Sequence, residues 1–302
     1  MSAWKNGFVA VAWTALVCCA LAVVSGCPNT NGNNGQDTTD ANSPDGTDEH
    51  NDNNGVTPGT GGEVPAGGVI ADHTAAVAFD DIPAAAIAAA QAAFRIFYGH
   101  TSHGSQIVTG LEMLQVEDAR YAFNTGADTL TLTEESGDLG ENGDLAWVDV
   151  TRNVLDAPGN NINLVAWSWC GGVSGNTTEG IDAYLTAMDA LEADYPDVVF
   201  IYMTGHLDGT GPTENLYARN NQIRAWCAAH GKALFDFADI ESYDPAGNYY
   251  PDGSDWCEWC TTWCEAHTCP TCIECAHSQC MNCYQKGRAF WWLLARLAGW
   301  NG

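Results

Sequence analysis

Short apolar runs alternate with amphipathic stretches from Gly67 to the end of the chain. The short runs are typical of buried strands, and the stretches between them carry apolar residues at helical spacing. This repeated order of strand, loop and helix predicts a mostly parallel sheet covered by helices on both faces. We expect strands near residues 94–98, 129–133, 161–167, 198–203 and 232–237, and helices near 81–93, 104–114, 145–155, 179–195, 214–230 and 284–297.

The first 27 residues follow a different pattern. Lys5 precedes an uncharged apolar run, and the sequence Val-Ser-Gly-Cys, which ends at Cys27, places small residues before a cysteine. These are the parts of a secretory signal, and the cysteine resembles that of the bacterial lipoprotein lipobox. The resemblance implies a signal peptide over residues 1–26 and lipidation of Cys27. The alternative is a transmembrane anchor. Either way, the remaining chain is expected outside the cytoplasm, and Pro28 after the cysteine favours the outer membrane.

Residues 27–66 are expected to form a disordered tether, because they are rich in Asn, Gly, Asp and Thr and contain seven acids but no Lys or Arg. The whole chain has 38 acidic and 10 basic residues and a net charge of −28. Residues 67–302, the predicted folded domain, keep 31 acids and 9 bases, about −22. This charge excludes non-specific binding to nucleic acid or to an anionic membrane surface. It also disfavours a strongly acidic substrate.

Polar, glycine-rich loops follow the predicted strands, where parallel sheets bind their ligands. They are Gly-His-Thr-Ser-His-Gly-Ser (99–105), Ser-Trp-Cys-Gly-Gly (168–172) and Thr-Gly-His-Leu-Asp-Gly (204–209), and Glu-Cys-Ala-His-Ser (274–278) precedes the last helix. A serine nucleophile needs a base such as imidazole, which a carboxylate can orient. Glu274 is spaced to reach His277. Backbone N–H groups of Gly171 or Gly172, with a donor near His206, are candidates for an oxyanion hole.

The order of these blocks resembles that of the SGNH (GDSL-type) hydrolases. That family has a serine after the first strand, a glycine after the second, a Gly-x-Asn-type loop after the third and an Asp-x-x-His motif before the last helix. The block Gly-His-Thr-Ser-His-Gly is similar to a His-x-Ser-x-Gly variant of divergent members. The resemblance covers residues 94–299. It implies a three-layer α/β/α, flavodoxin-like SGNH hydrolase fold with Ser102 as nucleophile and His277 as base.

Three departures from the family pattern leave alternatives open. Glu274 replaces the usual Asp, and His206 stands where the family has Asn. The Gly-Asp-Ser triplet is absent, which leaves Thr101 and Ser105 as alternatives to Ser102. The resemblance implies hydrolysis of esters, often acetyl groups on carbohydrate, without a cofactor. Four aromatic residues are candidates to stack on a sugar: Trp147, Trp167, Trp169 and Tyr202. For Trp167 and Tyr202, a position in the core is the favoured alternative.

Two other functions compete with the ester hydrolase. The first is a non-catalytic cell-surface module that binds glycan or Ca²⁺ through its acidic loops. The second is a metal-dependent hydrolase built on His100, His206 and His277, with His103 and Asp208 as accessory ligands, since imidazoles and a carboxylate suit Zn²⁺. For His100 and His103, a structural role in the turn is the further alternative.

Eight cysteines gather in a predicted insertion over residues 256–283, between the last strand and the last helix. In an exported protein they favour disulfides over a metal knot. Disulfides here would hold the backbone of His277, which lies inside the insertion. With two cysteines elsewhere, the candidates number ten, an even count: Cys170, Cys227, Cys257, Cys260, Cys264, Cys269, Cys272, Cys275, Cys280 and Cys283.

Overall fold

The computed structural model describes residues 64–302. The predicted signal peptide (1–26), the lipidation site Cys27 and residues 28–63 of the predicted tether lie outside the described residues. No single described helix has the length and apolar character needed to cross a membrane. One pair of consecutive helical segments, His73–Asp81 and Ala84–Ala93, meets these criteria together but is bent by 115°.

A single six-stranded sheet forms the centre of the fold, and its strands are all parallel, in the order β1-β6-β5-β4-β2-β3. The predicted parallel sheet is confirmed. Strands β4, β5 and β6 are buried along their whole length, which explains their continuous apolar sequences. The strands are β1 (Val69–Ala71), β2 (Arg95–His100), β3 (Thr131–Ser136), β4 (Leu164–Trp167), β5 (Val199–Met203) and β6 (Ala233–Phe235).

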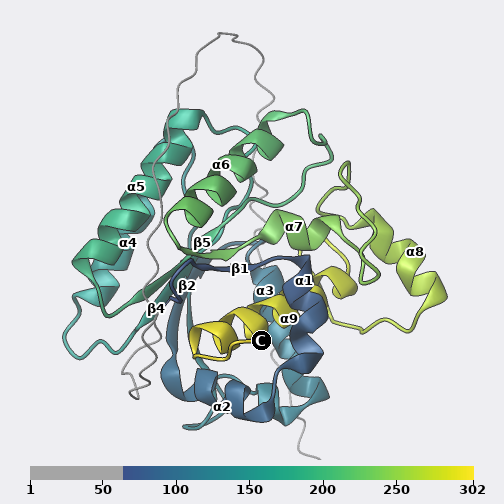
Figure 1. Cartoon of the computed structure of the whole chain (residues 1–302), viewed down its shortest axis with the longest axis horizontal. Coiled ribbons are helices and arrows are strands. Elements are labelled where there is room, and N and C mark those ends of the chain that lie inside the picture. The colour runs from purple at the N-terminus through teal and green to yellow at the C-terminus, as the bar shows by residue number, and fades with distance from the viewer. Residues whose placement is uncertain (1–63) are drawn as a thin grey trace, which may run out of the picture.

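Helices cover both faces of the sheet (Figure 1). On one face, α9 packs against α1, α2 and α3, and on the other, α5 packs against α4 and α6. The predicted three-layer α/β arrangement is therefore confirmed. The helices are α1 (His73–Val77), α2 (Ala84–Ala93), α3 (Ser105–Glu117), α4 (Ala146–Leu155), α5 (Thr178–Asp194), α6 (Asn215–Ala229), α7 (Phe237–Ser242), α8 (Glu258–Ala266) and α9 (Cys280–Leu297), with 3-10 turns η1 (Ala78–Asp81) and η2 (Ala119–Tyr121).

Two glycines let α3 and α9 approach closely. A Cβ atom on Gly110 would lie 2.1 Å from the carbonyl oxygen of Cys283, and one on Gly287 would lie 2.4 Å from the backbone of Gly110. Larger residues at either position would push the helices apart. The contact matters because α3 begins just after Ser102, while α9 begins just after His277.

The strand order reverses between β2 and β4. The chain pairs β3 with one edge of β2 and then returns to place β4 on the other edge. A crevice outside the carboxyl ends of two such strands is the usual ligand site of an open parallel sheet. Here those ends are His100 and Trp167. The loops that leave them contain Ser102 and Gly171.

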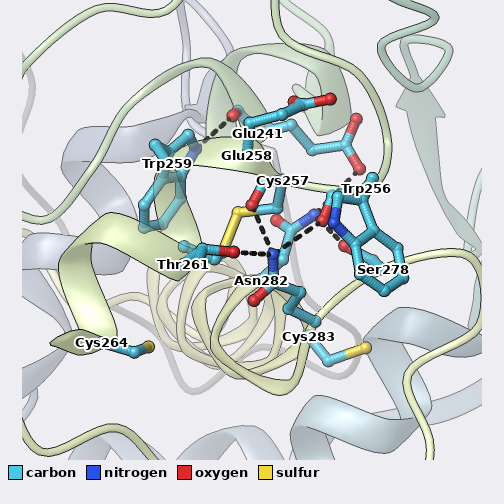
Figure 2. Close-up of a disulfide and its surroundings, with 12 residues drawn as sticks. Glu241, Trp256, Cys257, Glu258, Trp259, Thr261, Cys264, Ser278, Asn282 and Cys283 are labelled. Atoms are coloured by element: carbon cyan, nitrogen blue, oxygen red, sulfur yellow. Dashed lines mark hydrogen bonds between the residues drawn. A yellow bond between two sulfur atoms is a disulfide. The ribbon is translucent and has the colours of Figure 1, made fainter.

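Four disulfides stabilise the predicted cysteine-rich insertion: Cys257–Cys260, Cys264–Cys269, Cys272–Cys280 and Cys275–Cys283. The prediction of disulfides for these eight cysteines is confirmed. Figure 2 shows the first of them beside Trp259 of α8, whose indole N–H donates to the backbone oxygen of Glu241 at 2.8 Å. The insertion is therefore attached to α7.

The prediction of a disulfide at Cys227 is wrong. Its thiol is free and is buried on α6. Burial raises the pKa of this thiol above its ordinary value, and nearby carboxylates add to the effect. Cys227 therefore acts as a small apolar core residue. Cys170, the other candidate outside the insertion, is disulfide-bonded.

Candidate functional site

The loop after β2 carries the predicted nucleophile and is held by its neighbours. A Cβ on Gly99 would lie 2.1 Å from the Trp167 ring, and one on Gly104 would lie 2.2 Å from the hydroxyl of Ser168. Only glycine fits at these two positions, so β2 and β4 and the loops that follow them pack tightly. The N–H of Ser168 also donates to the carbonyl of Gly99 at 3.0 Å.

The three hydroxyl groups of this loop have different partners. Thr101 Oγ1 donates to the Asp138 carboxylate at 2.5 Å, and Ser105 Oγ donates to the carbonyl of Ser102 at 2.7 Å. Ser102 Oγ lies 3.5 Å from Cys170 Sγ, a weak contact across the switch point of the sheet. Ser102 is therefore the hydroxyl least committed to the protein itself.

Three imidazoles stack in a row at this edge of the sheet. The ring of His103 lies 3.7 Å from that of His206 and 4.4 Å from that of His277, measured between centroids, with planes nearly parallel. Nε2 of His103 lies 3.0 Å from the Asp255 carboxylate. We call His103, His206, His277 and Asp255 the histidine cluster.

The charges of the cluster follow from burial and proximity. Burial lowers the pKa of His103, although the hydrogen bond to Asp255 opposes that shift. The lowered pKa favours the neutral form of His103, and Nε2 is the ring atom that faces the Asp255 carboxylate. Its Nδ1 atom is buried and has no hydrogen-bond partner in the described part of the chain. Partial burial raises the pKa of Asp255, but the hydrogen bond with His103 and the proximity of the imidazoles outweigh it and hold this pKa low.

The predicted hydrogen bonds of the Ser-His-Glu triad are not formed in this conformation. Within residues 64–302, no hydrogen bond joins Ser102 to His277, and none joins Glu274 to His277. Glu274 is exposed to solvent. Catalytic hydrogen bonds often form only when substrate binds. The carboxylate that accompanies the imidazoles is Asp255, which no sequence motif indicates.

His277 has a left-handed backbone, with φ of +59°. This conformation costs a non-glycine residue about 1 kcal/mol or more. Neighbouring contacts hold it. Gln106 Nε2 donates to the carbonyl of Ala276 at 2.5 Å, and the Cys275–Cys283 disulfide joins the loop to α9. The His277 backbone is thus set by contacts on both sides.

The candidate oxyanion groups lie at the same edge. Gly171 and Gly172 both have left-handed backbones, with φ of +72° and +62°. The N–H of Gly171 donates to Nε2 of His206 at 3.2 Å, and Nδ1 of His206 donates to the carbonyl of Leu207 at 2.6 Å. In this conformation His206 offers no free N–H, and Gly172 keeps a backbone N–H without a hydrogen-bond acceptor within residues 64–302.

The two remaining accessory candidates lie outside the histidine cluster. His100 contacts the carbonyl of Thr101 through Nδ1 and the Glu134 carboxylate through Nε2. These contacts fit the alternative prediction for His100, a structural role in the turn. Asp208 Oδ1 accepts hydrogen bonds from the N–H and hydroxyl of Thr210 in its own loop.

The aromatic residues expected to stack on a sugar are buried. Trp147, Trp167, Trp169 and Tyr202 are each at most 2% exposed. The expectation that Trp167 and Tyr202 lie in the core is confirmed. The prediction that any of these four residues stacks on a sugar is wrong. Trp169 donates its indole N–H to the carbonyl of Met203, which ties the loop after β4 to β5.

Two groups of side chains bring potential metal-binding atoms within 4.8 Å of one another: His103, His206 and Asp255, and Asp72, His73 and Asp239. Neither fits a metal ion. The parallel rings of the first group direct their lone pairs side by side, whereas Zn²⁺ needs them to converge at about 2.0–2.1 Å. In the second group, Asp72 accepts from Thr74, and Asp239 pairs with His73. The predicted metal set His100, His206 and His277 does not gather around one point, because His100 pairs with Glu134.

No protein-family model and no curated protein matches this sequence. The chain is similar to a solved structure from Bacteroides fragilis described as a "putative acylhydrolase". The two share 11% sequence identity with a TM-score of 0.32, and the match covers 53% of this chain and 76% of that chain. A TM-score this low supports no conclusion about activity, so the proposals that follow rest on the residues of the site.

A buried polar network lies beneath the histidine cluster. The Lys286 ammonium is 2.7 Å from the Glu241 carboxylate and 2.5 Å from the Gln106 side-chain oxygen, and neither charged side chain has any exposed surface. Glu241 also accepts the N–H of Leu207 at 2.7 Å. Gln106 holds the carbonyl of Ala276. The network therefore fixes the backbone next to His206 and next to His277.

Proposed function

We propose that this protein hydrolyses acyl esters by a serine mechanism, with Ser102 as nucleophile and His277 as general base. The observation that carries the proposal is the position of Ser102. Of the three hydroxyl groups in the loop, that of Ser102 has the weakest contact with the protein. Ser102 lies at the switch point of the sheet and directly precedes His103 of the histidine cluster. A hydroxyl with imidazole and carboxylate groups at hand is what acyl transfer requires.

The mechanism has two halves. Ser102 Oγ attacks the ester carbonyl carbon while His277 takes the hydroxyl proton. The tetrahedral intermediate then collapses, the bond to the alcohol oxygen breaks, and His277 returns the proton to the departing alcohol. Water next attacks the acyl-serine with His277 again as base, which releases the carboxylic acid and restores Ser102. The N–H of Gly172 is the proposed donor to the oxyanion.

Asp255 takes the role that the sequence assigned to Glu274. A carboxylate supports an imidazole that takes a proton during the reaction, and Asp255 is the carboxylate of the cluster. His103 lies between Asp255 and His277, since it is hydrogen-bonded to the first and stacked on the second. We regard His103 as a positioning residue that keeps these two groups in place.

Hydrolysis of 4-nitrophenyl acetate by matched variants tests this assignment. We expect His277→Ala to lower kcat by about 10²–10⁴-fold, because general base catalysis contributes that much. Asp255→Asn should lower kcat by at least about tenfold, because it removes the charge that stabilises protonated His277. Glu274→Gln, the matched control, should retain the wild-type rate.

A loss with Glu274→Gln that equals the loss with Asp255→Asn would overturn the assignment of the carboxylate. Wild-type protein with no esterase activity would favour the non-catalytic surface module over the hydrolase.

The protein is also proposed to act outside the cytoplasm, anchored in the cell envelope through a lipid on Cys27. Two features support this proposal: the signal-like sequence that ends at Cys27, and four disulfides in one short segment. Disulfides persist in oxidising compartments and are rare in the cytosol. The substrate would then be an ester on the cell surface or in the surrounding medium, with carbohydrate esters as the expected class.

A further inference from the structure

A cavity of about 220 Å³ lies beside the loops that carry His206 and Asp255. Its walls come from the loop after β5, from α6 and α7, and from the loop between α7 and α8. Leu207, in its wall, directly follows His206, and Gly253, also in its wall, lies two residues before Asp255. The two loops pair through a hydrogen bond from the Gly209 N–H to the Gly253 carbonyl at 3.1 Å. A group bound in the cavity would therefore lie beside the loops that carry His206 and Asp255.

Three tyrosines line this cavity, and two of them expose aromatic surface. Tyr249 is 47% exposed and Tyr217 is 39% exposed, among the most exposed large aromatic side chains of the described protein. The Tyr243 ring is held by two neighbours, because the ring centroid of His73 stacks on it at 3.6 Å and that of Tyr249 at 4.8 Å. Rings held in this way present a preformed flat apolar surface.

Two carboxylates in the cavity wall offer hydrogen-bond acceptors. Asp208 and Asp239 each use Oδ1 within the protein, for Thr210 and His73 respectively. No hydrogen bond within residues 64–302 uses the Oδ2 atom of either carboxylate. Both oxygens can therefore accept hydroxyl or ammonium protons from a ligand.

The cavity also carries a negative charge. Its one basic side chain, Arg224, donates to both carboxylate oxygens of Asp236 at 2.6 Å and 2.8 Å, so that charge is already paired. Asp239 contacts His73, whereas Asp208 has no ion pair within residues 64–302. An anionic ligand would therefore be repelled here, and a neutral or cationic one accepted.

We propose that this cavity binds a sugar unit of the substrate, and that the sugar is neutral or aminated rather than acidic. The inference rests on the proposed ester hydrolysis, since it names the alcohol part of that ester. Pyranose C–H groups would pack on Tyr217 and Tyr249, while sugar hydroxyl or amino groups donate to Asp208 and Asp239. Aromatic surface combined with a few placed polar groups is the usual composition of a small-ligand site. Asp208 is thereby assigned to sugar binding rather than to metal binding.

The test measures binding without hydrolysis, by calorimetric titration of the full chain with three tetrasaccharides. These are N-acetylchitotetraose (neutral), its deacetylated form (cationic) and tetragalacturonate (anionic). We expect the first two to bind and the third not to bind. Tyr249→Ala and Tyr217→Ala should each weaken binding about tenfold, the loss of one aromatic contact. Tyr195→Ala, at the far end of α5, is the matched control and should bind as the wild type does.

The expected result includes unchanged hydrolysis of 4-nitrophenyl acetate by both tyrosine variants, because that ester carries no sugar. Absence of binding by either non-acidic tetrasaccharide at 10 mM would overturn the inference. Equal binding of tetragalacturonate, or full binding by both folded tyrosine variants, would do the same. Failure of the ester hydrolysis alone would instead remove the proposed function and leave the sugar site standing.

Discussion

Replacing Ser102 by alanine is expected to lower kcat/KM on 4-nitrophenyl acetate by about 10⁴-fold or more. The substitution removes only the hydroxyl, so no nucleophile remains to form the acyl-enzyme. The protein should keep its stability, because Ser102 Oγ has only the weak contact with Cys170 Sγ. An intact thermal transition in the variant would assign the loss to chemistry rather than to unfolding.

Two further substitutions make this result specific. Ser174→Ala removes an exposed hydroxyl that makes no hydrogen bond within residues 64–302, on the loop after β4, and should retain wild-type activity. Thr101→Val removes the hydroxyl that the Asp138 carboxylate holds, and should affect stability more than the chemical step. If Ser102→Ala kept more than about a tenth of the wild-type rate, Ser102 would not be the nucleophile.

Replacing Glu241 by glutamine is expected to lower the free energy of unfolding by about 3–5 kcal/mol. The substitution leaves the Lys286 ammonium without a counter-ion where it has no exposed surface. Urea unfolding with the disulfides intact measures the effect. Asp194→Asn is the control, because it breaks an exposed pair with Arg152 and should cost less than about 1 kcal/mol.

The pH dependence of this loss has a definite sign. Burial lowers the pKa of Lys286 below its ordinary value of 10.5, and Glu241 opposes that shift, so removal of Glu241 should lower the pKa further. Between the folded and unfolded pKa values the unfolded chain binds more protons, and stability therefore rises with pH. We expect the deficit of Glu241→Gln to shrink as the pH rises towards 10.

A second substitution provides the complementary test. Adding Lys286→Met to Glu241→Gln should recover much of the lost stability, because the uncompensated charge is gone. If Glu241→Gln alone cost no more than Asp194→Asn, the buried pair would not be the charged contact described. Because Glu241 also holds the Leu207 N–H, the single variant should lose esterase activity beyond its loss of stability.

Most of the sheet could be predicted from the sequence because its inner strands are buried on both faces. Leu164–Trp167 and Val199–Met203 form continuous apolar runs that no exposed segment would tolerate. β1 has three residues and α7 has six, too few to display a period, and both were missed. α8 was hidden in the cysteine-rich segment, where spacing indicates disulfides but not the conformation between them.

The site was predictable in part for a topological reason. Parallel strands end at one edge, so the loops containing Ser102, Gly171 and His206 had to gather there. The carboxylate of the site does not follow from the strand topology. The sequence favours Glu274 because it is close to His277 along the chain, whereas Asp255 contacts His103 from 152 positions away. Its approach depends on the pairing of Asp208 with Ser254 and on a disulfide-bonded insertion, neither of which leaves a signal in the sequence.

The number of cysteines does not predict whether Cys227 forms a disulfide. An even number of cysteines in an exported domain favours complete pairing, but a single thiol on the buried side of α6 is equally satisfied by apolar packing. The sugar-stacking residues were misassigned for a related reason. Tryptophans beside strand ends serve as core residues here, and the exposed rings that line the cavity are tyrosines of α6 and of the loop after α7.

The claim that Ser102 is an activated nucleophile is tested most directly by covalent labelling with a fluorophosphonate, followed by mass spectrometry of the tryptic peptide 96–120. We expect one adduct per chain, on Ser102, with labelling slowed in His277→Ala and absent in Ser102→Ala. An adduct on Thr101 or Ser105, which lie in the same peptide, would contradict the assignment. So would an unlabelled peptide from protein that still hydrolyses the ester.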